Sequence, residues 1–254
     1  MYNCRSYCYL LSIITINKNN SEGLLKTICS FGSLSGHKDI EFIFIDGESI
    51  DASVKIAKSF YTTNAIFSEP DAGIYNAMNK GLYRCSGKYV LWINSGDEIM
   101  PNIIEHIISI LTDSSEAIIS FGVKVVDSLQ ERKDHEWYSD RKDLPRSTFP
   151  HQGCFFLRYD LLSVGGYDEK YRYAGDRDLI LRLYYANKNI KTIREVVSVF
   201  YTGGISFSRD AMLEGQMIDK KYHLASSIKL LWRRLRYNNE VILGPFKRAV
   251  FGGK

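Results

Sequence analysis

The chain has 254 residues, of which 45% are hydrophobic and 24% charged, and its formal net charge is +4. This length and composition allow a large buried core and exclude collagen-like, low-complexity and disordered proteins. The five cysteines are scattered without the spacing of zinc ligands, so we expect reduced thiols in a cytoplasmic protein.

Strands and helices alternate along the first part of the chain. Short β-rich runs at residues 10–16, 41–45 and 65–67 are separated by helical stretches at 21–29 and 49–61. This order predicts a parallel sheet with helices on both faces.

The first apolar run favours a strand over a signal peptide, because Ser12 and Thr15 interrupt it and only one arginine precedes it. It leads to residues 17–20, Asn-Lys-Asn-Asn, and not to the glycine fingerprint of a dinucleotide-dependent oxidoreductase, which disfavours that class. No stretch of the sequence approaches the roughly 18 apolar residues of a membrane-spanning helix.

A turn at residues 70–73 opens the next helix, which Asp71 can cap. Asn76 and Lys80 are four residues apart on the face opposite its apolar residues, where they can meet an anionic ligand near the helix start. We therefore expect Asp71 and Lys80 at a phosphate-facing site.

A short apolar run at residues 89–93 is typical of a strand buried on both faces. Asn94, Ser95 and Asp97 follow it, as Asp46 follows the second strand. Ligands of alternating α/β folds collect beyond the carboxyl ends of the strands, so these polar residues stand where we expect chemistry.

The second half of the chain alternates less regularly. Residues 130–150 are charged and aperiodic, and we expect them to form a loop over the site, where substrate specificity is built. Around this loop the sequence predicts helices from residues 101 and 175, and strands at 117–126, 153–158 and 190–201.

The C-terminal tail is strongly basic. Residues 221–254 hold eight basic residues against one acid, a charge of +7 that leaves −3 for the rest of the chain. An amphipathic helix here would dock either on the domain or on an anionic membrane surface, whereas nucleic acid is disfavoured because no reader motif accompanies the charge. Its apolar face is Leu224, Ile228, Leu231 and Leu235, and its basic face is Lys229, Arg233 and Arg236.

Six segments together resemble the family 2 glycosyltransferases of bacterial polysaccharide assembly, which have a GT-A fold. They are SIITINKNN at the first strand, FIDGESIDAS at the second, SEPDAGIYNAMNKG, LWINSGDE, HQG and GDRDLILRL. The resemblance implies an α/β fold with a Rossmann-like, mostly parallel sheet flanked by helices. It also implies a catalytic domain over 1–206, with a nucleotide-binding half to about residue 98 and an acceptor-binding half over 99–206, followed by a basic helical region over 207–254.

The family implies inverting transfer from a nucleoside-diphosphate sugar, usually with a divalent metal, Mn²⁺ or Mg²⁺, on the diphosphate. By the resemblance, Asp46 contacts the nucleoside base and Thr15 lies on the adjoining strand edge. Asp97 matches the last carboxylate of the metal-binding acidic motif, in which Asn94 and Gly96 stand where many relatives carry aspartates. A hard cation wants several oxygen ligands, so this motif predicts a weak site completed mainly by the UDP-sugar donor.

Asp176 matches the family's catalytic base, which relatives carry in a Glu-Asp pair whose glutamate is here Gly175. A carboxylate at a helix start can accept the proton of the attacking sugar hydroxyl while the diphosphate leaves, and the anomeric configuration then inverts. Asp178 is an alternative base, a contact to the acceptor or the diphosphate, or a capping acid. His151 and Gln152 are candidate contacts to the acceptor or the diphosphate, or else a structural pair.

The sequence therefore predicts a cytoplasmic transferase, peripheral on the inner face of the bacterial inner membrane. It would add one hexose to a polyprenyl-diphosphate-linked sugar in O-antigen or capsule repeat assembly. The finer expectation, from a resemblance to small O-antigen β-1,3-transferases, is glucose from UDP-glucose onto N-acetylgalactosamine-diphospho-undecaprenol, with galactose and N-acetylglucosamine donors open. Because the acidic motif has fewer aspartates than in many relatives, a catalytically silent nucleotide-sugar-binding subunit is the alternative.

Overall fold

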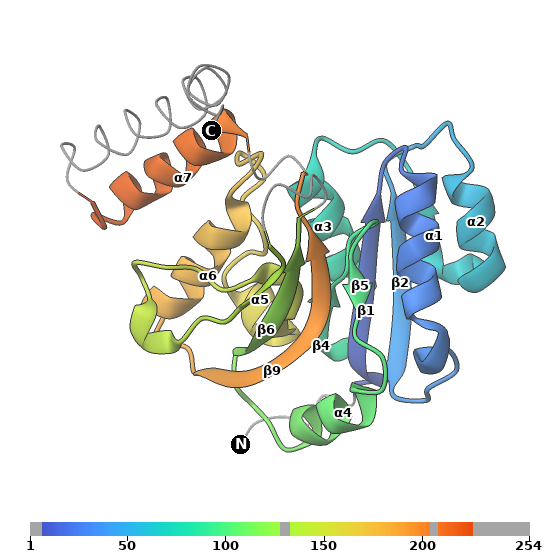
Figure 1. The fold of residues 1–254 in the computed structure, drawn as a ribbon, viewed down its shortest axis with the longest axis horizontal. Coiled ribbons are helices and arrows are strands. Elements are labelled where there is room, and N and C mark those ends of the chain that lie inside the picture. Colours follow the sequence, from blue (N-terminus) through green and yellow to red (C-terminus); the bar gives the residue numbers. More distant parts are fainter. Residues whose placement is uncertain (1–6, 128–132, 204–207, 226–254) are drawn as a thin grey trace, which may run out of the picture.

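The computed structural model describes residues 7–127, 133–203 and 208–225. These residues form one nine-stranded sheet with helices on both faces (Figure 1). Its strand order is β3-β2-β1-β4-β8-β6-β9-β5, and β7 pairs with β6. The strands are β1 (Tyr9–Asn17), β2 (Ile40–Asp46), β3 (Ile66–Ser68), β4 (Gly87–Trp92), β5 (Glu98–Ile99), β6 (Ile118–Val126), β7 (His135–Trp137), β8 (Cys154–Leu157) and β9 (Ile190–Tyr201). The helices are α1 (Ser21–Ser30), α2 (Ser53–Phe60), α3 (Ile74–Arg84), α4 (Ile104–Thr112), α5 (Arg158–Ser163), α6 (Gly175–Tyr185) and α7 (Arg209–Lys221).

Four parallel strands build the first half of the sheet. Asn17 at the end of β1 lies opposite Asp46 at the end of β2, which in turn lies opposite Ser68 at the end of β3. On its other side β1 pairs in parallel with β4, with Ile14 opposite Trp92. The carboxyl ends of all four strands therefore meet at one edge of the sheet, as the alternation of strands and helices predicts.

The second half of the sheet is mixed. β8 runs antiparallel to β4 and to β6, β9 is parallel to β6, and β5 is antiparallel to β9. The predicted α/β fold is thus confirmed, although this half contains more antiparallel pairing than we expected. β5 and β7 are two and three residues long, too short for a hydrophobic period to reveal them.

The two faces of the sheet carry different helices. Ile14 and Ile16 of β1 share a buried cluster with residues of α3, α5 and α6, whereas Leu11 and Ile13 share another with residues of α4. A third cluster joins α1 and α2 to β2, at the right of Figure 1. Because both faces are covered, β1 and β4 are buried at nearly every position.

Helix α7 packs against α6 (Figure 1). Ile218 is fully buried in the cluster that includes the apolar residues of α6, and Asp219 pairs with Arg177 of α6 at 2.6 Å. This helix comes from the region that the sequence assigned to a basic tail, yet it shares the core of the sheet. Most residues of the predicted tail faces lie in 226–254, outside the described residues.

The four cysteines that the structure describes, Cys8, Cys29, Cys85 and Cys154, are free thiols. None of the helices in the described ranges combines the length and apolar character needed to span a bilayer.

Candidate functional site

A cavity of about 310 Å³ lies beyond the carboxyl end of β4. This volume is at the lower end of the range usual for small-molecule sites. The cavity is walled by α3, the start of α6, β7, β9 and the short 3₁₀ helix His151–Gly153. Its lining residues are Ile74, Tyr75, Met78, Asn94, Trp137, His151, Gln152, Arg172, Tyr173, Asp176 and Phe200.

Asp176 brings a carboxylate into this cavity from the first turn of α6. Its Oδ1 accepts a hydrogen bond from the Arg177 N–H at 2.8 Å and a long one from the Tyr75 hydroxyl at 3.5 Å. Burial and the Asp176 charge raise the pKa of Tyr75, so the phenol stays protonated and can donate. No donor to Oδ2 is found within the described ranges, which leaves this oxygen available to accept a proton.

Gly175 stands beside Asp176, at the position where the family resemblance implies a glutamate. A Cβ at this position would lie 2.8 to 3.0 Å from three atoms of the Tyr75 ring. The ring that supports Asp176 therefore occupies the space that a glutamate side chain would need.

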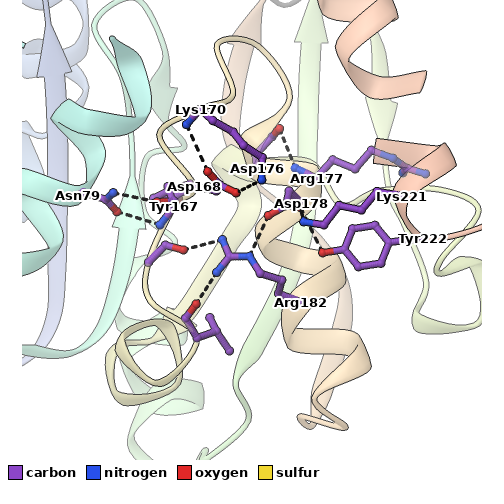
Figure 2. A network of polar contacts seen from close by, with 12 residues as sticks. Asn79, Tyr167, Asp168, Lys170, Asp176, Arg177, Asp178, Arg182, Lys221 and Tyr222 are labelled. Carbon is purple, nitrogen blue, oxygen red and sulfur yellow. Dashed lines mark hydrogen bonds and ion pairs between the residues drawn. The ribbon is translucent and has the colours of Figure 1, made fainter. Parts of the chain in front are cut away.

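Asp178 does not line the cavity. It is fully buried and accepts from Arg182 Nε at 2.8 Å, Lys221 Nζ at 2.6 Å and the Tyr222 hydroxyl at 3.1 Å (Figure 2). Burial raises the pKa of Asp178, but the hydrogen bonds and charges of Lys221 and Arg182 outweigh it and hold the pKa below its usual value. The structure thus gives Asp178 to the contact between α6 and α7, which corrects the substrate-contacting role that the sequence offered it.

His151 and Gln152 both line the cavity, and their contacts with the acceptor or the diphosphate stay predictions. His151 Nε2 lies 2.6 Å from the Tyr167 hydroxyl, and burial lowers the pKa of His151, so the imidazole is neutral near pH 7. Gln152 Nε2 donates to Asp97 Oδ2 at 3.3 Å. Asp97 is buried behind Gln152, and this burial raises the pKa of Asp97 to about 7. Asp97 therefore lies one layer away from the cavity wall.

The loop between β4 and β5 presents unpaired polar atoms. Asn94 Oδ1 and Ser95 Oγ are buried and lack a partner in the described part of the chain, and Asn94 lines the cavity. Buried acceptors of this kind are expected to meet a ligand or ordered water. Gly96 has a φ of +108°, so an aspartate in its place, as in many relatives, would strain the backbone.

These residues fit a divalent cation only weakly. Within the described residues no group of three His, Cys, Asp or Glu side chains is arranged to hold a metal. Asn94 Oδ1 and the Asp97 carboxylate are the oxygen ligands that the loop can offer, and a hard cation would take most of its ligands from an anionic substrate.

Asp46 occupies the end of β2, where the sequence predicts it. The carboxylate is fully buried and accepts four hydrogen bonds: from the Ser49 N–H at 2.8 Å, Ser49 Oγ at 2.6 Å, Ser68 Oγ at 2.7 Å and Asn17 Nδ2 at 3.1 Å. Burial raises the pKa of Asp46, but these donors outweigh it and leave the pKa below its usual value. Asp46 ties together the ends of three strands, so a direct contact with a nucleoside base requires the exchange of one of these bonds.

Asp71 lies close to the end of β2. Its Oδ1 accepts from the Gly73 N–H at 3.0 Å and lies 4.0 Å from Lys18 Nζ. A Cβ on Gly47 would approach Asp71 Oδ2 to 2.1 Å, so the glycine makes room for this carboxylate beside Asp46. Asp46 and Asp71 are thus two acidic residues near the ends of the parallel strands, and neither of them lines the cavity.

Lys80 and Thr15 are not brought to the cavity. Lys80 Nζ donates to the Pro70 carbonyl at 2.6 Å and pairs with Glu69 at 3.3 Å, so it closes the turn before α3. Thr15 is fully buried and accepts from the Tyr61 hydroxyl at 3.0 Å, on the sheet face that α2 covers. Thr15 keeps the place on the strand edge that the sequence predicts, whereas the contact of Lys80 with a ligand stays a prediction.

Sequence reasoning missed the two side chains that anchor the loop before α6. Asn79 of α3 accepts from the Tyr167 N–H at 2.8 Å and donates to the Tyr167 carbonyl at 2.9 Å (Figure 2). Glu214 of α7 accepts from the N–H groups of residues 172, 173 and 174 at 2.7, 2.6 and 2.7 Å. Asn79 lies in the SEPDAGIYNAMNKG segment, whose family match was the available signal, whereas Glu214 carries no local signal.

The fold and the sequence can be compared with known proteins. Residues 12–166 match the family described as glycosyl transferase family 2. The uncharacterized glycosyltransferase Rv1514c of Mycobacterium tuberculosis is 31% identical over 205 residues, which cover 79% of this chain and 78% of that protein.

Two solved structures share the fold. TarS 1-349 of S. aureus in complex with UDP-GlcNAc has a TM-score of 0.64 at 14% identity, with 91% of this chain and 72% of that chain covered. The mannosyltransferase PcManGT from Pyrobaculum calidifontis, in complex with GDP-Man and Mn²⁺, has a TM-score of 0.62 at 13% identity, with 87% and 66% covered. At this identity the two likenesses establish the GT-A fold alone.

Proposed function

The chain belongs to glycosyl transferase family 2, and on that premise we propose that it moves a hexose from a UDP-sugar to a polyprenyl-diphosphate-linked sugar with inversion. The observation that carries the proposal is Asp176, a carboxylate in the cavity whose Oδ1 is held while Oδ2 is available. This is the arrangement that a general base for a sugar hydroxyl requires.

The reaction is a single displacement. The acceptor hydroxyl oxygen forms a bond to the anomeric carbon as the bond from that carbon to the diphosphate oxygen breaks, and the electron pair leaves with UDP. Asp176 Oδ2 takes the hydroxyl proton, while the bonds from the Arg177 N–H and Tyr75 keep the carboxylate oriented. No covalent intermediate with the chain is needed, so the anomeric configuration inverts.

We assign the donor to the carboxyl ends of β1 to β4 and the acceptor to the residues contributed by 99–206. In this assignment Asp46 and Asp71 contact the nucleoside, and Asn94, Ser95 and Asp97 meet the diphosphate. The unpaired Asn94 Oδ1 and Ser95 Oγ support it. A divalent cation such as Mn²⁺ or Mg²⁺ would be held by Asn94 and Asp97 together with the donor, and when bound it supplies charge neutralisation at the leaving diphosphate.

The finer assignment is glucose transfer from UDP-glucose, in β-1,3 linkage, to N-acetylgalactosamine-diphospho-undecaprenol during O-antigen or capsule repeat assembly. UDP-galactose and UDP-GlcNAc are the competing donors, and the second is the ligand named for the TarS structure. We place the enzyme on the inner face of the bacterial inner membrane because the charge of +7 in residues 221–254 suits an anionic surface.

The proposal is tested by measuring UDP release from a panel of UDP-sugars with Mn²⁺ and a synthetic lipid-diphosphate sugar acceptor. We expect acceptor-dependent release by the native enzyme, a loss of about 10²- to 10⁴-fold in Asp176→Asn, and a loss in Asp97→Ala. Asp210→Asn, an exposed acid of α7, is the matched control and should retain native activity. Equal activity of Asp176→Asn and the native enzyme would refute the assignment of the base.

A catalytically silent nucleotide-sugar-binding subunit is the second candidate. The observations that favour it are the positive φ of Gly96, which disfavours an aspartate at that position, and the lack of a three-ligand acidic cluster within the described residues. Binding of UDP to the native protein without release from any donor and acceptor pair would support this candidate over the transferase.

A further inference from the structure

Arg172 is the one arginine or lysine that lines the cavity among the described residues, and the displacement proposed above does not use it. Its side chain is exposed at the cavity rim, four residues before Asp176. Because Asp176 contributes a negative charge to the same cavity, an anionic ligand would be repelled there without a compensating cation.

The other arginines of this region already have partners. Arg177 donates to Asp219 and to the carbonyl of Ser147, and Arg182 donates to Asp178 and to the carbonyl of Gly166. No acceptor for the Arg172 guanidinium is found in the part of the chain that the structure describes. Its planar set of N–H donors is thus available to a ligand.

The backbone under Arg172 is held in place. Glu214 Oε1 accepts from the Arg172 N–H at 2.7 Å, and Glu214 Oε2 accepts from the next two N–H groups at 2.6 and 2.7 Å. Asn79 holds the other end of the same loop at Tyr167. The arginine therefore projects from an anchored segment at a fixed spacing from Asp176, which distinguishes it from an arginine on a free loop.

The expected cation for the diphosphate, Lys80, is committed elsewhere, since it donates to Pro70 and pairs with Glu69. Arg172 can replace it in this role, because a guanidinium binds phosphate oxygens in a bidentate manner. We propose that Arg172 binds the diphosphate of a substrate in this cavity. This inference rests on the proposed function, in which both the nucleotide donor and the lipid-linked acceptor carry a diphosphate.

Binding measurements test the inference without turnover. The native protein, Arg172→Gln and Arg172→Lys are titrated with UDP, with a short-chain lipid-diphosphate N-acetylgalactosamine, and with the same sugar on a neutral linker. Arg209→Gln is the control, because Arg209 is an exposed arginine that does not line the cavity. Thermal denaturation of each variant verifies that it is folded.

We expect Arg172→Gln to weaken one diphosphate ligand by about 10- to 100-fold, with the neutral-linker sugar and the control unaffected and Arg172→Lys intermediate. Weaker UDP binding identifies the diphosphate of the donor, and weaker binding of the lipid-diphosphate sugar identifies that of the acceptor. Native affinity of folded Arg172→Gln for both diphosphate ligands would overturn the inference. If the native protein shows no turnover but Arg172→Gln still loses affinity, the transferase proposal fails while the diphosphate site stands.

Discussion

Replacing Asp178 by asparagine tests whether this residue of α6 stabilises the fold, in contrast to Asp176, to which we assign the chemistry. The substitution keeps the size of the side chain but removes the charge that Arg182 and Lys221 face in Figure 2. It also removes one of the two oxygens that accept their hydrogen bonds. Asp178 is fully buried, so the loss cannot be made good by water at this position.

The magnitude follows from the exposure of the partners. Removing one member of a buried ion pair costs about 3 to 5 kcal/mol, because the other charge is left without compensation. The Arg182 and Lys221 side chains are 21% and 40% exposed, so water can partly solvate both. We therefore expect the lower end of that range, about 3 kcal/mol, and a fall in Tm of roughly 6 to 12 °C for a chain of this length.

The pH dependence gives a second signature. The pKa of Asp178 is lowered in the folded protein, so its ionised form stabilises the fold above the unfolded value near 3.8. This contribution is lost as the pH falls through the lower, folded pKa. The difference in stability between the native protein and Asp178→Asn should therefore be full at neutral pH and should shrink below about pH 4.

Urea and thermal denaturation measure the stability of each protein, and UDP release at 20 °C measures activity while the variant is still folded. Asp176→Asn is the paired comparison, since it should lose activity without losing stability. A variant Asp178→Asn that is as stable as the native protein but inactive would refute the reasoning and favour Asp178 as the general base.

Three further predictions concern Glu214, Asp97 and Lys80. Glu214→Gln replaces one acceptor oxygen by an amide donor that faces the loop N–H groups, so kcat for UDP release should fall by about 10²-fold. The control Asp210→Asn should keep the native kcat, and equal kcat values for the two variants would contradict the anchoring role of Glu214. The pKa of Asp97 is about 7 in the folded protein against an ordinary value of 3.8, so in metal-free buffer the stability of the native protein should fall as the pH rises between these two values. Thermal denaturation at several pH values tests this, and an Asp97→Asn variant with the same pH dependence would show that Asp97 does not cause it. Lys80→Met should lower the free energy of unfolding in urea by less than about 1.5 kcal/mol and change the affinity for UDP, measured by calorimetry, by no more than about threefold. A larger loss of affinity would show that Lys80 contacts the ligand.

Local patterns in the sequence predicted the elements that carry the candidate site. The apolar run of β4 and the helix expected from residue 175 are features of neighbouring residues, and they placed Asn94 and Asp176 at the ends of elements that meet at the cavity. Short strands such as β5 escaped prediction because two residues cannot display a period.

The partners of buried charges could not be predicted in the same way. Asp178 meets Lys221, 43 residues later, and the loop N–H groups meet Glu214, 40 to 42 residues later. A helical period indicates which face is buried but not which distant side chain faces it. For Lys80 the partners are close in sequence: its position on α3 suggested a contact with a ligand, but its ammonium group binds the Pro70 carbonyl and the Glu69 carboxylate.

The position of Glu214 has a consequence for how the protein is made. Synthesis proceeds from the N-terminus, so the loop at residues 172–174 leaves the ribosome 40 residues ahead of the carboxylate that fixes it. The strand ends with Asp46, Asn94 and Asp97 can form before α7 emerges, but the start of α6 obtains its anchor only afterwards. A nascent chain halted before α7 would therefore possess these strand ends without the Glu214 anchor of the loop before α6, and the transfer proposed above would become possible only late in translation.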